Sequence, residues 1–348
     1  MLSGRRDIVR IGILGAGALA VGGGLSGLVS AEPEPTLNAG LRGYLTGLHD
    51  PVIIRERDTY HVFGSGGWQG KPGPSWRTSR DLRSWTDNGS PFDIPAWAKQ
   101  AIPKATSVWA PDISFVDGLY RLYYSVSTGG SMRSVTGFAT SPTLDRTRPD
   151  YGWTDHGLVI ESFIGGTYNV IDSNFVVDAD GSHWLVFGSY WSGIKLIALD
   201  RKTGKPDPAR GDIHSIAYRP APTGGDNPIE GAFIFQHGGW HYLFASYDYC
   251  CKKEQSNYYV AAGRSRSILG PYVGRDGRAM MEGYGTAVIV ERPWGATRWR
   301  GPGHCGLFHD RDRDLIVYHA YDVEHGSAPT LRLAELRWDA DGWPVALT

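Results

Sequence analysis

Residues 184–189 of the chain read WLVFGS, a short run of strand-forming residues with an aromatic residue in the fourth position. Four further segments keep this pattern, and the steps between successive fourth residues are 60, 64, 57 and 74 residues. A unit that recurs in this way is typical of radial or stacked arrays. The five segments are 60–65 (YHVFGS), 120–125 (YRLYYS), 184–189 (WLVFGS), 241–246 (HYLFAS) and 315–320 (LIVYHA).

Each repeat also contains the other parts of a small antiparallel sheet. Dipeptides that suit tight hairpin turns, such as Asp117-Gly118 and Gly238-Gly239, precede the aromatic segment. A unit of about 60 residues suits a four-stranded blade. We therefore predict an all-β fold in which residues 32–348 form a single five-bladed β-propeller. Strand-like runs, several of which include the repeated segments, lie at 52–54, 113–116, 119–126, 175–177, 184–190, 194–199, 232–235, 240–247, 258–263, 287–290, 307–308, 315–321 and 331–338.

One ionisable residue precedes each aromatic segment, at offsets of 13, 11, 15, 14 and 14 residues. In a propeller this position opens the innermost strand of each blade, so the five side chains are expected to meet at the central axis. These residues are Asp50, Asp112, Asp172, Glu230 and His304.

Three of these residues suit acid–base chemistry. Asp172 and Glu230 are flanked by apolar residues, and an unpaired buried carboxylate is costly unless its pKa rises. Together with Asp50, they are expected to push one another's pKa values apart. One carboxylate then stays ionised and one stays protonated, which is the division that hydrolysis of a glycosidic bond requires. The longer Glu230 reaches a leaving oxygen, and a shorter Asp leaves space for a water.

The other two axial residues allow several readings. Asp112 follows Pro111, a context that suits a structural turn, so we interpret Asp112 as a supporting residue and Trp109 as a stacking platform. A single His304 at the axis binds a metal with waters, orients a carboxylate, or is a hydrogen-bonded core residue. One ligand alone is weak support for a metal site.

Composition limits the possible partners. The net charge is −1 and no basic run follows the first residues, which argues against nucleic acid. Thirteen Trp and 18 Tyr suit sugar binding or a β core. The three cysteines leave at least one free thiol in an exported protein, and the pairings considered are one bridge from the Cys250-Cys251 pair to Cys305 or buried thiols.

The N-terminus has the features of a targeting segment. Arg5-Arg6 precedes an apolar run over 8–29, and small residues follow at 29–31. We predict a signal peptide over 1–31, of the twin-arginine type, with a general secretory signal as the alternative. The mature protein is expected to be secreted, without a membrane anchor.

Several of these segments resemble glycoside hydrolase family 43, and within it the α-L-arabinanases. The resemblance runs from about residue 47 to the C-terminus, and the motifs occur in the family's order. They are HDP (49–51), WAPD (109–112), IDSNF (171–175), GSYWSGI (188–194), IEGAF (229–233), YDYCC (247–251) and GPGH (301–304).

The resemblance implies a five-bladed propeller that cleaves α-1,5-linked L-arabinan with inversion of configuration. Asp50 would be the general base, Glu230 the general acid, and Asp172 the residue that tunes the pKa of the acid. It also implies a calcium ion near the axis at His304. From the motifs we predict further substrate contacts, made by Trp109, Asn174, Ser189, Tyr190 and Trp191.

The chain departs from the family pattern at Ser173, Gly231-Ala232 and Cys305, which affects specificity more than activity. Two alternatives stay open: an exo-acting α-L-arabinofuranosidase or β-xylosidase on the same scaffold, and a non-catalytic sugar-binding propeller. The expected partner is arabinan or an arabino-oligosaccharide, and the expected state is a monomer.

Overall fold

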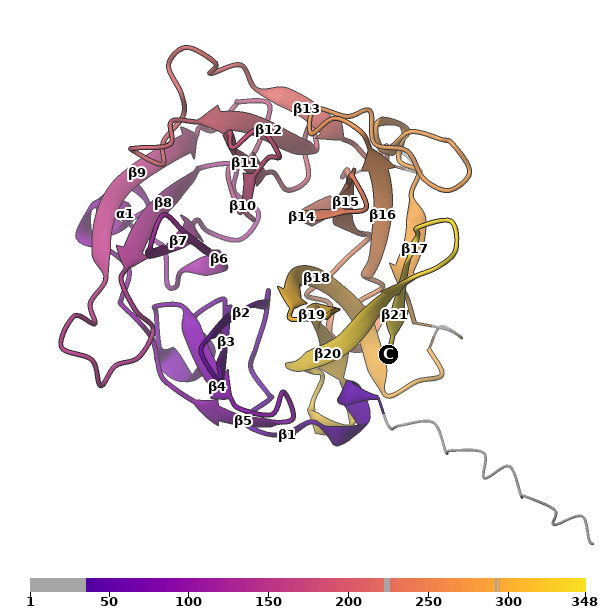
Figure 1. The fold of residues 1–348 in the computed structure, drawn as a ribbon, viewed down its shortest axis with the longest axis horizontal. Helices are drawn as coiled ribbons and strands as arrows, with labels where there is room; N and C mark the ends of the chain where they lie inside the picture. The colour runs from indigo at the N-terminus through magenta and orange to yellow at the C-terminus, as the bar shows by residue number, and fades with distance from the viewer. Residues whose placement is uncertain (1–35, 222–225, 292, 294) are drawn as a thin grey trace, which may run out of the picture. The chain divides into compact units, whose positions relative to one another are not determined.

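The computed structural model describes residues 36–348 except 222–225, 292 and 294. The signal peptide predicted over 1–31 lies outside these residues. In the described part of the chain the strands form five sheets, arranged as a ring with one inner strand of each sheet toward the central axis (Figure 1). The five-bladed β-propeller predicted from the repeat is confirmed.

Each sheet is an antiparallel meander in which strands that follow one another in sequence are paired. The first sheet has an additional outer strand, β1, which pairs parallel to β5. The first sheet contains β1 (Arg42–Gly43), β2 (Val52–Glu56), β3 (Thr59–Gly64), β4 (Ser75–Ser79) and β5 (Ser84–Asp87). The second contains β6 (Trp109–Val116), β7 (Leu119–Val126), β8 (Ser134–Ser141) and β9 (Thr154–Ser162).

The remaining three sheets have four strands each. The third contains β10 (Asn174–Val177), β11 (His183–Phe187), β12 (Ile194–Leu199) and β13 (His214–Ala217). The fourth contains β14 (Ile229–His237), β15 (Trp240–Tyr247), β16 (Tyr259–Ser265) and β17 (Thr286–Ile289). The fifth contains β18 (Trp299–Asp310), β19 (Arg313–Asp322), β20 (Ala328–Trp338) and β21 (Pro344–Leu347).

Helices contribute only short connections in the described residues. The α-helix α1 (Ala96–Ala101) packs beside β8 and β9. The 3-10 helices are η1 (Leu37–Gly40), η2 (Trp68–Gly70), η3 (Lys253–Gln255), η4 (Met280–Glu282) and η5 (Val323–His325). Within the described part of the chain, none of the helices has the length and apolar character needed to cross a membrane.

The predicted hairpin dipeptides form the expected turns. Asp117 (φ 53°) and Gly118 (φ 79°) join β6 to β7, and Gly238 (φ 57°) and Gly239 (φ 73°) join β14 to β15. Two successive residues with positive φ are the requirement of a two-residue turn whose twist matches that of the strands.

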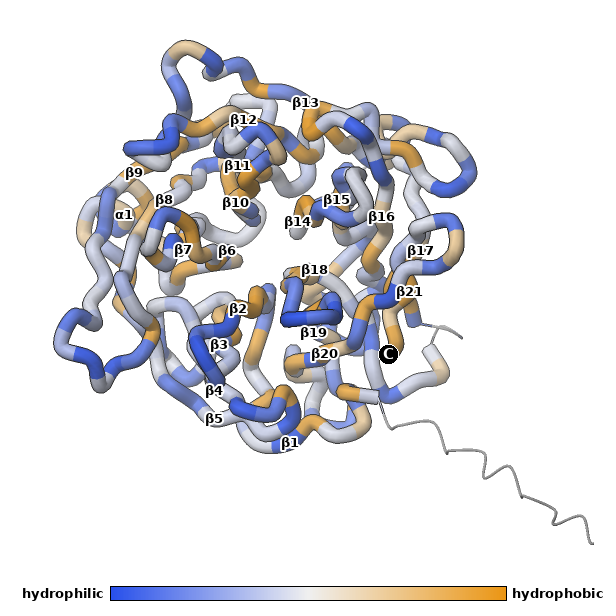
Figure 2. Tube along the Cα trace, in the orientation of Figure 1, coloured by the Kyte–Doolittle hydropathy of each residue, from blue (hydrophilic) through white to orange (hydrophobic). Residues whose placement is uncertain are grey.

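The core lies between the blades. Side chains alternate along a strand, so one strand contributes to the packing on both sides of its sheet. In β15, Leu243 and Ala245 pack against the third sheet, whereas Tyr242 and Phe244 pack against the fifth. Apolar residues gather along the strands, and the peripheral loops are mostly hydrophilic (Figure 2).

The segment before β2 closes the ring onto the last blade. The Oδ1 of Asn38 accepts a hydrogen bond from the Leu333 amide (2.9 Å), and its Nδ2 donates to the hydroxyl of Tyr318 (3.0 Å). The Gly47 amide donates to the carbonyl of Pro329 (2.7 Å). This closure holds the first and fifth blades together, and with them the axial residues that these two blades supply.

Candidate active site

The inner strands depart from regular geometry where they approach the axis. Asp50, Asp172 and His304 have φ values of 54°, 60° and 47°, a region that non-glycine residues rarely adopt. In the fourth blade the same place holds a register shift between Glu230 and Phe233. Bulges and left-handed residues re-aim side chains and are frequent beside active sites. Here they turn the four side chains toward the axis.

A cavity of about 340 Å³ lies at the axis, and four of the five predicted axial residues line it. Asp112 is not among its lining residues. The residues that form the wall are His49, Asp50, Ser65, Gly66, Trp109, Ile171, Asp172, Glu230, Cys250, Cys251 and His304. The cavity therefore brings together three carboxyl groups from the first, third and fourth blades.

Asp50 is surrounded by donors. Its Oδ1 lies 2.6 Å from Nδ1 of His49 and 3.0 Å from Nδ1 of His304, and its Oδ2 accepts from the Ser65 hydroxyl at 2.5 Å. Burial alone would raise the pKa of Asp50, but the two imidazoles hold it well below the ordinary value of 3.8. Asp50 is therefore ionised at neutral pH and suits the role of a base.

Glu230 has the opposite tendency. Burial raises the pKa of Glu230, against hydrogen bonds from Ser189 to Oε2 (2.7 Å) and from Tyr258 to Oε1 (3.1 Å). The charge of Asp50 raises it further. These two hydroxyls fix the orientation of the carboxyl group, and the raised pKa favours the protonated form that an acid needs.

Asp172 is the third carboxyl group of the cavity and lies next to Glu230. Burial raises the pKa of Asp172 to about 7; the His304 cation opposes this rise, and the charges of Glu230 and Asp50 add to it. Its Oδ2 accepts a hydrogen bond from the Gly231 amide at 3.1 Å, directly beside Glu230. Since the two carboxyl groups repel one another when both are ionised, Asp172 favours protonation of Glu230.

His304 belongs to the carboxylate network. Burial alone would lower its pKa, but Asp50 outweighs burial and raises the pKa of His304 to about 9. The Gly residues before it allow a close approach, because a Cβ on Gly303 would lie 2.1 Å from the ring of Tyr258. Of the three readings of His304, orientation of a carboxylate is the one with direct contacts.

The donors around His304 fit a calcium ion poorly. Calcium prefers six to eight oxygen ligands. Among the described residues, the triads with ligand atoms close enough to share an ion are His49 with Cys250 and Cys251, and His49 with Asp50 and His319. His304 is in neither set. The residues around His304 therefore do not form the oxygen-rich set that calcium prefers.

Asp112 and Asn174 tie blades together away from the cavity. Asp112 is 3% exposed and its Oδ2 accepts from the Phe175 amide (2.7 Å); burial raises the pKa of Asp112 to about 7. Asn174 is 3% exposed and its Oδ1 accepts from the Ile234 amide (2.9 Å). The structural interpretation of Asp112 agrees with these contacts. The Oδ1 of Asn174 is thus occupied between β10 and β14, and substrate contact by this residue stays a prediction.

The other predicted contact residues differ in position. Trp109 lines the cavity, with its indole N–H donated to Ser107 (3.1 Å). Ser189 is buried and acts on Glu230 instead of lining the wall. Tyr190 and Trp191 are half-buried in the turn between β11 and β12 and are not wall residues. Substrate contact by these residues stays a prediction.

Sequence reasoning missed the hydroxyl and imidazole partners of the carboxylates. Ser65, Ser189 and Ser246 occupy the same last position of the repeated segment, and each bonds to an axial residue or to the inner strand of the next blade. Ser65 accepts from the Ala110 amide (2.8 Å), and Ser246 accepts from the His304 amide (2.8 Å). The signal was present in the repeat, as a Ser that ends four of its five copies.

The cysteines pair differently from the proposed bridge to Cys305. Cys250 and Cys251 form a disulfide with one another, and Cys305 is free and buried. Cys305 packs between the fourth and fifth sheets with Phe244 and Leu307. It thus behaves as a small apolar residue of the core.

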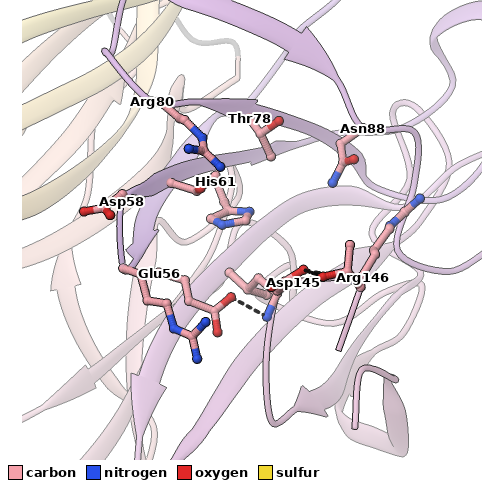
Figure 3. A pocket seen from close by; sticks show the side chains of 12 residues that line it. Glu56, Asp58, His61, Thr78, Arg80, Asn88, Asp145 and Arg146 are labelled. Atoms are coloured by element: carbon pink, nitrogen blue, oxygen red, sulfur yellow. Dashed lines mark hydrogen bonds between the residues drawn. The ribbon is translucent and has the colours of Figure 1, made fainter. Parts of the chain in front are cut away.

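A second cavity, of about 440 Å³, is lined by residues of the first sheet and the loop after β8 (Figure 3). Burial lowers the pKa of His61 in its wall to about 4, so this ring is neutral. Glu56 in the same wall is bonded to the Leu144 amide (2.8 Å). Glu56 ends the strand that Asp50 precedes, so the two lie roughly 20 Å apart along β2. This cavity is separate from the carboxylate cluster.

Comparisons with known proteins agree with this arrangement. The profile of Glycosyl hydrolases family 43 matches residues 45–344. The chain is 40% identical over 299 residues to the extracellular endo-alpha-(1->5)-L-arabinanase 1 of Bacillus subtilis (strain 168), a match that covers 85% of this chain and 87% of that protein. It is 37% identical over 306 residues to the extracellular exo-alpha-(1->5)-L-arabinofuranosidase ArbA of Cellvibrio japonicus (strain Ueda107), covering 85% of each.

A solved structure shares the fold as well. The α-L-arabinanase of Cellvibrio cellulosa in complex with arabinohexaose superposes with a TM-score of 0.81 at 36% identity. The match covers 87% of this chain and 96% of that one.

Proposed function

The chain belongs to family 43 of the glycosyl hydrolases and is therefore a glycoside hydrolase, and on that premise we propose that it cleaves α-1,5-linked L-arabinan with inversion of configuration. One observation carries the assignment of roles. Two carboxyl groups in one cavity have pKa values shifted in opposite directions, Asp50 downward and Glu230 upward. Such a pair can supply a base and an acid at the same pH.

In the proposed reaction Asp50 accepts a proton from a water molecule, and the water oxygen bonds to the anomeric carbon. Glu230 donates its proton to the glycosidic oxygen as the bond to that oxygen breaks. His49 and His304 keep Asp50 ionised, and Ser189 and Tyr258 orient Glu230. Positioned acids and bases of this kind each contribute about 10²–10⁴-fold to the rate.

Asp172 is proposed to tune the acid. Its Oδ2 accepts a hydrogen bond from the Gly231 amide beside Glu230, and its charge repels a charge on Glu230. Trp109 provides an apolar ring face in the cavity wall, and sugar C–H faces pack well on such a surface.

The substrate is proposed from the relatives, whose names all refer to arabinan linkages. One acts in endo mode and another in exo mode, at similar identity. Product analysis on linear arabinan distinguishes these: oligosaccharides of mixed length early in the reaction indicate endo action, and one short product from the start indicates exo action. Release of nitrophenol from an aryl β-xyloside would instead support the xylosidase alternative.

The direct test is hydrolysis of linear arabinan by the purified protein. We expect release of arabinose or arabino-oligosaccharides. A folded protein that releases neither, while binding arabinan, would contradict the proposal and support a sugar-binding propeller.

We also propose that the protein is exported and acts as a monomer. The relatives' names include the word extracellular, and size-exclusion chromatography of the mature protein tests the monomer. Calcium at His304 stays a prediction. Metal analysis of the purified protein, and activity before and after a chelator, decide it.

A further inference from the structure

A disulfide between neighbouring residues forms part of the cavity wall. Cys250 and Cys251 follow β15 and line the cavity together with Asp50 and Trp109. Cys251 is exposed and Cys250 is half-buried, so a reductant in solution reaches the bond. Because the disulfide closes a small ring around the peptide bond between the two residues, it limits rotation of the backbone that carries the Cys251 amide.

That amide begins a line of hydrogen bonds to Asp50. The Cys251 N–H donates to the hydroxyl oxygen of Tyr321 (2.8 Å), which lies 2.7 Å from Nε2 of His49. The Nδ1 of His49 lies 2.6 Å from Oδ1 of Asp50.

The ionised carboxylate fixes the direction of the last step of this line. A carboxylate only accepts, so Nδ1 of His49 carries a hydrogen atom and donates a hydrogen bond to Asp50. Nε2 of His49 and the hydroxyl of Tyr321 form a hydrogen bond in which either group can donate. In both cases the oxygen of Tyr321 can also accept the Cys251 N–H. Oδ1 of Asp50 is shared, because it lies 3.0 Å from Nδ1 of His304 as well.

His49 has few other contacts that fix its ring. It stacks on His319 at a centroid distance of 3.8 Å, and its remaining polar contact is with Sγ of Cys251 at 3.8 Å. A stack restrains the plane of a ring but permits sliding and rotation within it. The hydrogen bond to Tyr321 therefore decides where Nδ1 points.

The loop that carries the disulfide has an unfavourable backbone. Asp248, Cys251 and Lys253 have φ values of 68°, 65° and 55°. Non-glycine residues are unfavourable in this region and persist where the surroundings hold them. A covalent ring at 250–251 supplies such a restraint, and disulfides persist in exported proteins.

We propose that the Cys250–Cys251 disulfide is a redox-sensitive positioning element that holds Asp50 in place through Tyr321 and His49. In this inference, which rests on the proposed function, a dithiol reductant breaks the S–S bond. The two hydrogen atoms of the dithiol pass to the cysteine sulfurs and the dithiol becomes a cyclic disulfide. The loop then relaxes and the hydrogen bond from the Cys251 N–H to Tyr321 breaks. The carboxylate of Asp50 is then no longer held in the orientation that activates the attacking water.

The test compares the oxidised and reduced forms of the whole protein on linear arabinan. A shift of about 1 Å in a reacting group can cost about 100-fold in rate, so we expect kcat to fall by at least about 10-fold on reduction with dithiothreitol. We expect KM to change less than about two-fold, because Trp109 and the part of the cavity wall outside the disulfide loop stay in place. Alkylation and mass spectrometry count the free thiols, and removal of the reductant in air should restore kcat.

Two variants make the result specific. Cys250→Ser/Cys251→Ser should have the low kcat of the reduced protein and no response to dithiothreitol. Cys305→Ala, which changes the buried free thiol outside the cavity, should keep the full response. A melting temperature for each form distinguishes unfolding of the protein from misorientation of the Asp50 carboxylate.

The inference is overturned if both thiols of a folded protein are alkylated and kcat is unchanged, or if only KM rises. If the oxidised wild-type protein does not cleave arabinan, the proposed function fails and the role of the disulfide is overturned with it.

Discussion

The Nδ1 of His304 lies 3.0 Å from Oδ1 of Asp50, which joins the fifth blade to the first across the point where the ring closes. The pKa shifts of the two groups agree with this contact, since the pKa of Asp50 is lowered and the pKa of His304 is raised to about 9. Between the lowered pKa of Asp50 and about pH 9, the two groups are both charged and form an ion pair in a half-buried site. Ring closure by the segment before β2 thus also assembles the base.

The first prediction concerns this ion pair. His304→Gln removes the positive charge, so the pKa of Asp50 should rise toward its ordinary value. The base must be ionised to act, and therefore the acidic limb of the kcat/KM profile should move to higher pH. A pH–rate profile on linear arabinan measures the shift. An acidic limb that stays in place would mean that His304 does not act on Asp50.

The second prediction concerns the base itself. Asp50→Asn should lower kcat by at least about 100-fold, because an amide does not accept the proton of water. Asp112→Asn is the matched control: this side chain has the same phase in its repeat, lies outside the cavity, and an amide oxygen can still accept from Phe175. We expect the control to stay within about three-fold of wild type. Equal losses in the two variants would contradict the assignment.

The third prediction concerns the tuning of the acid by Asp172. Asp172→Asn removes a charge that repels ionised Glu230, so the pKa of Glu230 should fall. Because the acid must be protonated, the basic limb of the kcat/KM profile should move to lower pH. A shift to higher pH, or none, would argue against coupling between the two carboxyl groups.

The fourth prediction is a shift of the pKa of Glu230 in the opposite direction. The Ser189 hydroxyl stabilises ionised Glu230 by a hydrogen bond at 2.7 Å. Ser189→Ala should therefore raise the pKa of Glu230 and move the basic limb to higher pH, with a modest fall in kcat from looser orientation. Profiles of Ser189→Ala and Asp172→Asn recorded side by side provide an internal control, since they should diverge from the wild type in opposite directions.

The repeat predicted the fold well because each repeated segment lies in a strand that packs against a neighbouring blade on both faces of its sheet. Residues 119–126, 194–199 and 240–247 are strands with the predicted bounds. The strand β8 was not predicted. All eight of its residues are buried, so it lacks the polar–apolar alternation of a half-buried strand, and it reads SVTGFATS, with Ser, Thr and Gly among them.

The sequence predicted those site residues that stand at the same position of each repeat. Phase placed Asp50, Asp172, Glu230 and His304 at one axis, and they line one cavity. Other contacts lie outside that phase: Tyr258, which bonds to Glu230, lies in the loop after β15, and Tyr321, which bonds to His49, lies in β19. Tyr321 and the disulfide meet His49 only because the ring closes, and the closure is a tertiary property that no local pattern in the sequence contains.

The central claim is that Asp50 activates water on one side of the sugar while Glu230 protonates the oxygen on the other. Proton NMR of arabino-oligosaccharide hydrolysis, recorded from the first seconds, tests it most directly. The account predicts that the β-anomer of the new reducing end appears first and then equilibrates. Initial release of the α-anomer would show retention and would contradict the proposed roles of both residues.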